Sequence, residues 1–478
     1  MRFRLLLVVV AGLVGFGACS SSSNSAQEVF TSPFFNFKPG HPETRISAIG
    51  LYDETGESGI NIDVEVVFGS LVYRKNATLG MFEAIYTVEI DLIGIGEKNP
   101  GKLSFSLADT IRAKTDHVVY SQDVHTFHRR FLAPAGDYQV LVNVIDQNSE
   151  TGTLQRTVTS IPAMQDDVLD LTDIFLLARD LDKENSPFLV ATTYDIAGRN
   201  DSLKFQYQVT KTSSDKRVVI DMSLVKFKSD SLVARELYSP DYAQGSIGYR
   251  GIDRRKNYEI QTSRRVLTSE IGSILVEFST PMLDRGNYRF EVAITDEASG
   301  VTIRKARDFG IRSENYPSLK TPKELAAPLR YLMDDREYKN LMALEDDDDI
   351  KRAMDRFWLS HLKNRNIAGQ VVEMYYTRVE EANKQFSTFK EGWKTDAGMV
   401  YILYGRPWYV EQTSRRLRWV YGYNQFDARR VFEFFQPRFQ NADFPFLHFV
   451  AFRRNSYFQP IHQARAEWLN GTVLSRDL

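Results

Sequence analysis

The side chains that could bind a metal or carry acid–base catalysis form no known catalytic pattern in this 478-residue sequence. It contains no His-Glu-x-x-His motif, no Gly-x-Ser-x-Gly motif, no P-loop and no Rossmann glycine fingerprint. His125 and His128 lie in a segment with strand character, where residues three apart point to opposite faces. Residues 146–152 are similar to a calcium loop but lack its glycine at the sixth position, which favours a polar turn. We therefore predict no metal, no cofactor and no catalytic residue, and we favour a protein that is not an enzyme.

The single cysteine, Cys19, has a different chemistry. Residues 1–18 have the form of an export signal, with two arginines, an apolar run over residues 5–14 that is too short for a permanent membrane span, and small residues before the cysteine. Residues 16–19 (Phe-Gly-Ala-Cys) resemble a lipobox, although Phe16 replaces the usual Leu or Val. The alternative is an ordinary signal peptide with a cysteine beside it by chance. We predict a bacterial lipoprotein whose Cys19 carries lipid, with several acyl chains (palmitate among them) as the membrane anchor.

The residues after the cysteine indicate which membrane holds the protein. Residues 19–29 are rich in serine and read as a flexible tether. Ser20 follows the cysteine where an aspartate would favour retention in the inner membrane. Surface-displayed lipoproteins of some phyla carry an acidic run here, and this chain has only Glu28. We expect a lipid anchor in the outer membrane and a protein that faces the periplasm.

Composition narrows the choice of partners. With 43% hydrophobic and 26% charged residues, the chain is globular rather than disordered. Its formal net charge is −2 and no basic stripe is present, so nucleic acid is not an expected partner. Because the only cysteine is assigned to lipid, no disulfide is expected to hold the fold together.

The elements that must carry these residues begin with two β-rich regions. Residues 60–66 and 86–92 alternate apolar and polar side chains with a period of two, as antiparallel strands of a sandwich do. The same pattern returns at residues 203–209. We predict two tandem antiparallel β-sandwich modules, at residues 30–163 and 165–312.

The two modules share a segment at corresponding places. Residues 136–146 (GDYQVLVNVID) align with residues 286–296 (GNYRFEVAITD), and each is followed by a glycine-containing turn and another strand. This internal similarity indicates two copies of one module. The shared pattern resembles the penultimate strand of immunoglobulin and fibronectin type III sandwiches, in which a tyrosine bonds across a corner. Tyr138 and Tyr288 are therefore structural candidates rather than ligand contacts.

Helices are expected after a linker at residues 313–321. Thr321, Pro322 and Glu324 form an N-cap, a first-turn proline and a capping box. Two further helical stretches are predicted at residues 350–361 and 372–386. The acidic run at residues 345–349 fits the N-terminus of a helix, with a cation site as the alternative.

From Gly398 onward the pattern predicts strands, and with the three helices these make residues 322–478 an α+β domain with a mostly antiparallel sheet. The expected strands are residues 399–404, 417–423, 431–435 and 444–452. A short helix at residues 462–469 is expected to close the chain.

One motif is distinctive. Residues 391–398 read Glu-Gly-Trp-Lys-Thr-Asp-Ala-Gly, and this is similar to the signature of the GWxTD-domain family of bacterial proteins. The resemblance extends over residues 320–425 through two upstream blocks, 357–358 and 375–386. Two departures are Ala397, where the family usually has arginine, and Trp408, where it often has an acidic residue. The resemblance implies the domain layout and an envelope location, and it implies no activity.

The residues of the motif suit a structural corner. Gly392 and Gly398 permit positive φ for a sharp helix-to-strand turn. Thr395 and Asp396 can cap backbone amides, with Trp393 as an apolar plug beneath them. We expect Arg378 or Asn383 on the preceding helix to hydrogen-bond to Asp396. The alternative is a ligand site in which Trp393 stacks on the ligand and Asp396 accepts a hydrogen bond.

These observations favour a membrane-anchored, non-enzymatic binding or scaffold component of the cell envelope. Its expected partners are envelope proteins, for example of an outer-membrane assembly, secretion or uptake machine. The alternative is an envelope glycan or peptide hydrolase that uses acidic groups around Asp396.

Overall fold

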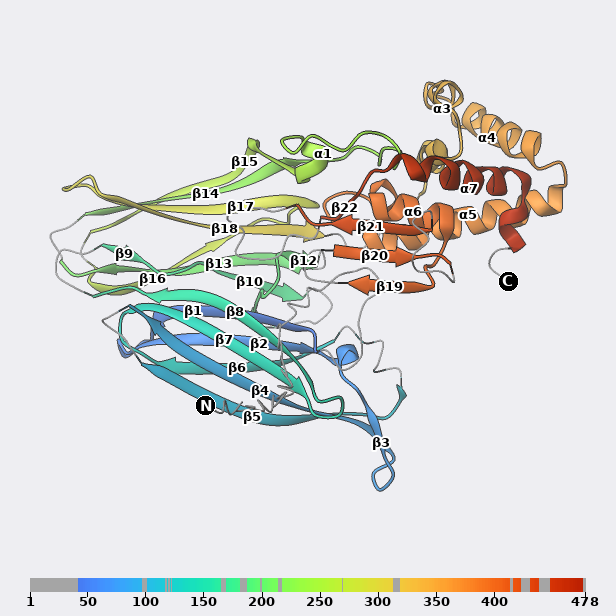
Figure 1. Cartoon of the computed structure of the whole chain (residues 1–478). Helices are drawn as coiled ribbons and strands as arrows, with labels where there is room; N and C mark the ends of the chain where they lie inside the picture. The colour runs from blue at the N-terminus through green and yellow to red at the C-terminus, as the bar shows by residue number, and fades with distance from the viewer. Residues whose placement is uncertain are drawn as a thin grey trace, which may run out of the picture.

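The computed structural model describes residues 42–475, except 97–100, 117, 119–120, 122, 165–168, 181–186, 198–199, 214–216, 269, 313–318, 413–415, 423–429 and 438–447. Cys19, the export signal, the tether and residues 30–41 lie outside the described residues, as does most of the expected linker. No helix in the described part is long and apolar enough to cross a membrane. The described chain consists mostly of antiparallel sheets in sandwich-like pairs, followed by a region rich in helices (Figure 1).

The first pair of sheets lies within residues 44–161, and we call it the first β-unit. The period-two pattern is confirmed, because the alternate side chains of residues 60–66 and 86–92 are almost completely buried between the two sheets. One sheet has the order β1-β2-β6, and the other has the order β3-β4-β7-β8 with β5 on the other side of β4. The strands are β1 (Thr44–Tyr52), β2 (Ser58–Val67), β3 (Arg74–Asn76), β4 (Met81–Ile95), β5 (Lys102–Ala113), β6 (Val124–Leu132), β7 (Gly136–Asp146) and β8 (Thr151–Ile161), with a 3-10 turn η1 (Phe68–Ser70).

The second pair of sheets lies within residues 170–312, and we call it the second β-unit. Its sheets have the orders β11-β10-β13-β16 and β12-β18-β17-β14-β15, and only β12 pairs in parallel among the described strands. The elements are β9 (Asp170–Leu171), β10 (Phe175–Asp180), β11 (Leu189–Val190), β12 (Asp195–Ala197), β13 (Asn200–Lys211), β14 (Val218–Ser229), α1 (Ile247–Arg250), β15 (Ile252–Leu267), β16 (Gly272–Ser279), β17 (Gly286–Asp296) and β18 (Thr302–Arg312).

The strand order repeats between the two β-units. The order β5-β4-β7-β8 in the first corresponds to β15-β14-β17-β18 in the second, and β1-β2-β6 corresponds to β10-β13-β16. The hydroxyl of Tyr138 donates to the carbonyl of Pro134 at 2.8 Å, and that of Tyr288 donates to the carbonyl of Asp284 at 2.6 Å. Each tyrosine therefore bonds four residues upstream at the same point of its unit.

The two β-units contact each other through a side-chain amide. Gln208 on β13 accepts a hydrogen bond from the backbone amide of Tyr52 at 2.8 Å and donates to the carbonyl of the same residue at 2.6 Å. These two bonds imitate the pairing of a neighbouring strand at the end of β1.

The remaining described residues, 319–475, form one hydrophobic core, and we call them the terminal domain. Its sheet, β19-β20-β21-β22, is antiparallel and lies beside helices α5 to α7 (Figure 1). The capping box at Thr321 and Glu324 is confirmed. The elements are α2 (Pro322–Ala326), η3 (Ala327–Tyr331), α3 (Asp335–Met342), α4 (Asp347–His361), α5 (Arg365–Phe386), η4 (Gly392–Lys394), α6 (Asp396–Tyr404), β19 (Tyr409–Gln412), β20 (Arg416–Val420), β21 (Val431–Phe435), β22 (Val450–Ala451), η5 (Asn455–Tyr457), α7 (Phe458–Asn470) and η6 (Thr472–Ser475).

Two expectations for this region are wrong. Residues 399–404 belong to helix α6 and not to a strand. The expectation failed because all nine residues of α6 are buried, and a continuous apolar run has no periodicity that distinguishes a buried helix from a buried strand. The expected three helical stretches also omit α3. The strand expected at 444–452 appears as β22 alone, and residues 444–447 lie outside the described part.

Candidate functional site

The motif lies between helices α5 and α6, where η4 turns the chain. Trp393 is 3% exposed and belongs to the core of the terminal domain. Tyr331 meets its ring edge-on at 6.2 Å and donates a hydrogen bond to the carbonyl of Trp393 at 2.6 Å. The indole therefore has no free face of the kind that ligand stacking requires.

The two glycines of the motif are needed for space rather than for backbone angle. A Cβ on Gly392 would lie 1.9 Å from the carbonyl oxygen of Ala382, and one on Gly398 would lie 1.9 Å from that of Gly392. Neither glycine has positive φ, so the expectation of a positive-φ turn is wrong. The physical reason is that η4 packs against the backbone of α5 at Gly392, and the first turn of α6 packs against η4 at Gly398, so neither position leaves room for a side chain.

Thr395 is the N-cap of α6. Its hydroxyl accepts a hydrogen bond from the amide of Gly398 at 2.9 Å and donates to the carbonyl of Gly392 at 2.7 Å. The threonine thus satisfies one free amide at the start of the helix and also fixes the preceding turn.

Asp396 is 6% exposed and forms an ion pair inside the protein. Its two oxygens accept from the guanidinium of Arg453 at 2.7 and 2.8 Å, in the two-bond geometry that favours arginine over lysine. One of these oxygens also accepts from the amide of Ala451 at 2.8 Å, so the carboxylate holds the start of α6 to β22. Burial raises the pKa of Asp396, but the charge of Arg453 and these hydrogen bonds outweigh burial and hold the pKa below its ordinary value.

The expected bond from Arg378 or Asn383 to Asp396 is wrong. Arg378 donates to the carbonyl of Ile402 at 3.3 Å, with its guanidinium 5.1 Å from the ring of Trp468. Asn383 accepts from the amide of Trp393 at 3.1 Å. Both side chains hold the backbone around the motif, and the carboxylate is bound from the other side by Arg453.

Sequence reasoning missed Arg453, which lies 57 residues after its partner. The only local signal is a positive charge that directly follows the apolar run Phe449, Val450, Ala451 and Phe452. Such a charge is ordinary at the end of a strand, and one sequence gives no means of pairing it with Asp396.

The other candidate residues lie far from the motif in the first β-unit. His125 contacts the hydroxyl of Tyr86 at 2.5 Å, whereas His128 contacts Asp63 at 2.9 Å. Asp146 is fully buried and accepts from the amides of its own turn, such as that of Asn148 at 2.7 Å. In the described residues, no three His, Cys, Asp or Glu side chains are grouped to hold a metal.

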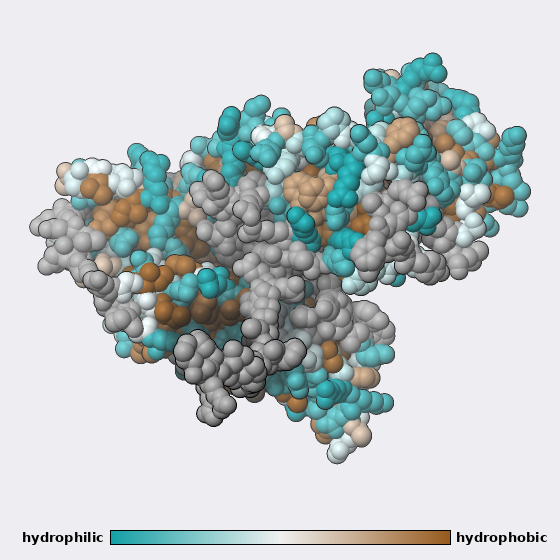
Figure 2. Space-filling model, in the orientation of Figure 1, coloured by the Kyte–Doolittle hydropathy of each residue, from teal (hydrophilic) through white to brown (hydrophobic). Residues whose placement is uncertain are grey.

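The acidic run begins α4. Asp346 is the N-cap, and it accepts from the amides of Asp348 and Asp349 at 3.0 Å each. The surface around α3 and α4 is predominantly hydrophilic (Figure 2). These carboxylates therefore act on the end of their own helix and face solvent.

A groove of about 590 Å³ opens on the outer face of the second β-unit. Asp221 and Arg264 on its wall pair with each other through two hydrogen bonds, at 2.6 and 3.0 Å. The groove lies on β14, β15, β17 and β18, and none of the motif residues lines it.

Residues 296–470 match the family profile of the GWxTD domain. No curated protein matches the chain. Solved structures that it resembles include red sea bream transglutaminase (8% identity, TM-score 0.19, 56% of this chain and 31% of that one) and a mutant of Salmonella alpha-2-macroglobulin (12%, 0.19, 57% and 17%). A third is Bacteroides uniformis beta-glucuronidase 2 (8%, 0.20, 55% and 28%). The chain thus spans less than a third of each of these proteins, and scores this low carry no functional argument.

Proposed function

Since this chain is a GWxTD domain-containing protein, we propose that it is a lipid-anchored, non-enzymatic scaffold of the bacterial cell envelope. In this proposal Cys19 holds it in the outer membrane on the periplasmic side, and the β-units carry the terminal domain toward envelope protein partners. The observation that supports a scaffold most directly is the burial of the motif.

A catalytic acid or base must reach the proton that it transfers. Asp396 is buried, and both of its oxygens are occupied by Arg453. The depressed pKa keeps this carboxyl ionised at neutral pH, and the arginine side chain paired with it is itself only 1% exposed. These features suit a group that fixes a fold, and they do not suit a hydrolase built around Asp396.

We also propose that the β-units are immunoglobulin- or fibronectin-like modules, at residues 30–163 and 165–312, joined by a linker at 313–321 to a domain at 322–478. The repeated strand order supports this assignment. The bonds of Tyr138 and Tyr288 to carbonyls four residues upstream support it further, because tyrosines at this corner are typical of such sandwiches.

The test of the anchor is Cys19→Ser, followed by fractionation of cells. Without acyl chains the variant should leave the membrane fraction, since hydrophobic anchoring depends on those chains. Sedimentation of the variant with the outer membrane in high salt would contradict the proposal. Crosslinking in intact cells, followed by purification of the wild type and of this variant, then identifies partners that depend on the anchor.

A further inference from the structure

The connection between β14 and β15 differs most between the two β-units. In the first, the equivalent strands β4 and β5 are joined by residues 96–101, whereas residues 230–251 join β14 to β15. This longer connection, which we call the docking segment, runs toward the terminal domain and includes α1 (Figure 1). It lies outside the matched family region, which begins at residue 296.

The docking segment contributes apolar side chains to the core of the terminal domain. Leu237 is 1% exposed and Ala234 is 8% exposed, and both belong to the same hydrophobic cluster as Trp393. The amide of Arg454 donates to the carbonyl of Leu237 at 2.9 Å. Leu232, in the same segment, is 66% exposed. The segment therefore inserts selected side chains and does not merely lie on the surface.

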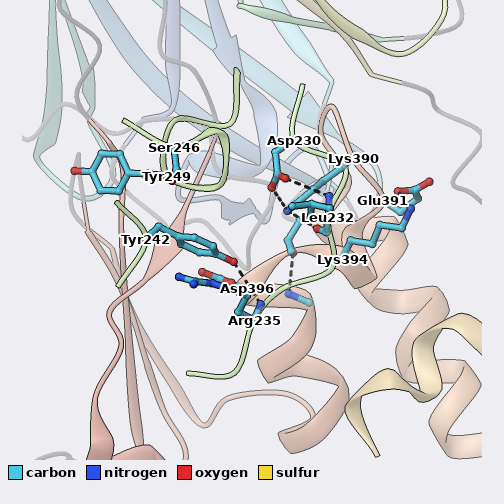
Figure 3. Close-up of polar contacts among 12 residues, drawn as sticks. Asp230, Leu232, Arg235, Tyr242, Ser246, Tyr249, Lys390, Glu391, Lys394 and Asp396 are labelled. Atoms are coloured by element: carbon cyan, nitrogen blue, oxygen red, sulfur yellow. Dashed lines mark hydrogen bonds and ion pairs between the residues drawn. The ribbon is translucent and has the colours of Figure 1, made fainter. Parts of the chain in front are cut away.

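A buried ion pair joins the start of the segment to the motif region (Figure 3). Lys390 donates to Asp230 at 2.6 Å, with exposed side-chain fractions of 7% and 3%, and it also donates to the carbonyl of Leu232 at 3.0 Å. Charges removed from water to this degree require each other, because the loss of one leaves the other buried without a partner.

The segment also contacts the partner of the motif carboxylate. The ring of Tyr242 lies 4.3 Å from the guanidinium of Arg453, and Asp241 accepts from the amide of Arg453 at 3.2 Å. The same guanidinium donates to the carbonyl of Arg235 at 3.5 Å. Arg453 thus lies between Asp396 on one side and the docking segment on the other (Figure 3 shows Tyr242 and Arg235 beside Asp396).

We propose that the surface of the terminal domain around Lys390 and Arg453 is an interaction surface whose occupant is the docking segment of this chain. The segment completes the fold around the motif, so the second β-unit and the terminal domain form one cooperative unit. The proposal rests on these contacts alone and goes beyond the envelope role, because it holds with or without a lipid anchor.

The experiment compares Leu237→Ala with Leu232→Ala in the full chain by hydrogen–deuterium exchange. The first change removes a buried side chain supplied by the β-unit, and the second removes an exposed one from the same segment. Leu237→Ala should speed exchange roughly tenfold or more in α5, α6 and α7, because local opening governs these amides. Leu232→Ala should leave them unchanged. Faster exchange confined to residues 230–251 would overturn the proposal.

A charge exchange gives a second measurement that does not depend on a cavity. Asp230→Lys and Lys390→Asp each place like charges together, and each should speed exchange in α6. The double variant restores opposite charges and should recover protection at least in part. Protection of β4 and β7 in the first β-unit reports whether a variant has unfolded as a whole. Equal exchange in the single and double variants, with β4 and β7 protected, would also overturn the proposal.

Discussion

The ion pair between Asp396 and Arg453 can be tested by two substitutions of the carboxylate. Asp396→Ala removes the acceptor of Arg453 and of the amide of Ala451. The loss of one partner of a buried ion pair costs about 3–5 kcal/mol, and the side chain of Arg453 is only 1% exposed. Asp396→Asn keeps one oxygen for these donors and loses the charge, so we expect a cost of about 2–3 kcal/mol, in the range of hydrogen bonds to charged groups.

The assay is chemical unfolding followed by tryptophan fluorescence. All five tryptophans lie between residues 358 and 468, so the signal reports the terminal domain and is blind to unfolding confined to the first β-unit. The matched control is Asp335→Asn, because Asp335 is paired with Arg330 but its side chain is 75% exposed. A surface pair of this kind contributes at most about 1 kcal/mol, and the control should unfold almost like the wild type.

A cycle with Arg453→Gln separates the pair from its surroundings. The double variant Asp396→Asn, Arg453→Gln should cost less than the sum of the two single changes, by on the order of 1–3 kcal/mol. Additive costs would refute the argument that the two charges act together. The hydrolase would instead be favoured if the Asp396→Asn variant were as stable as the wild type but cells that carry it showed the envelope defect expected of an inactive protein.

Four further outcomes follow from the structure. Burial holds the pKa of His448 at about 4, below the ordinary value of 6.5, so the folded state resists protonation of this side chain. The contribution of neutral His448 to stability is therefore complete above pH 6.5 and is lost as the pH falls from 6.5 to about 4. Fluorescence-detected unfolding across that window should show a less steep loss of stability in His448→Gln than in the wild type. Asp396 also has a lowered pKa, so its contribution is present above the ordinary carboxyl range and is lost only at lower pH; Asp396→Asn should flatten the most acidic limb of the same curve. Gly392→Ala should destabilise the terminal domain by about 1–3 kcal/mol through overpacking. Gly369→Ala on α5, where a Cβ meets nothing within 4 Å, should stabilise the domain by up to about 1 kcal/mol. Equal melting temperatures of the two variants would contradict the packing argument. Tyr138→Phe and Tyr288→Phe should each cost about 0.5–1.5 kcal/mol in the calorimetric transition that includes their β-unit, and a cost in only one of them would show that the two corners are not equivalent.

The features that the sequence predicts are those written in local patterns. Alternation at residues 60–66 reports one buried face, and the capping box at Thr321 marks a helix start with residues only three apart. The repeated segments around Tyr138 and Tyr288 revealed the shared corner because each corner bond spans four residues. Local chemistry is sufficient in each of these cases.

The features that the sequence hides are those that depend on distant partners. Helix α6 is buried on all sides, so its apolar run has no period and resembles a strand. The partner of Asp396 lies 57 residues away, and that of Lys390 lies 160 residues away in the second β-unit. No propensity or spacing links such residues, and the close contact that excludes a side chain at Gly392 exists only once η4 has packed against α5.

The attachment of the docking segment at both of its ends determines how a mechanical load would travel. A single linker after β18 would pass a pull on the terminal domain to one strand. Here the docking segment also follows β14 and leads into β15, and β14 is paired along its length with both β15 and β17. A force along these strands must shear many hydrogen bonds together instead of opening them one at a time. A tethered protein with this construction would transmit tension from a partner to its anchored end with its second β-unit intact.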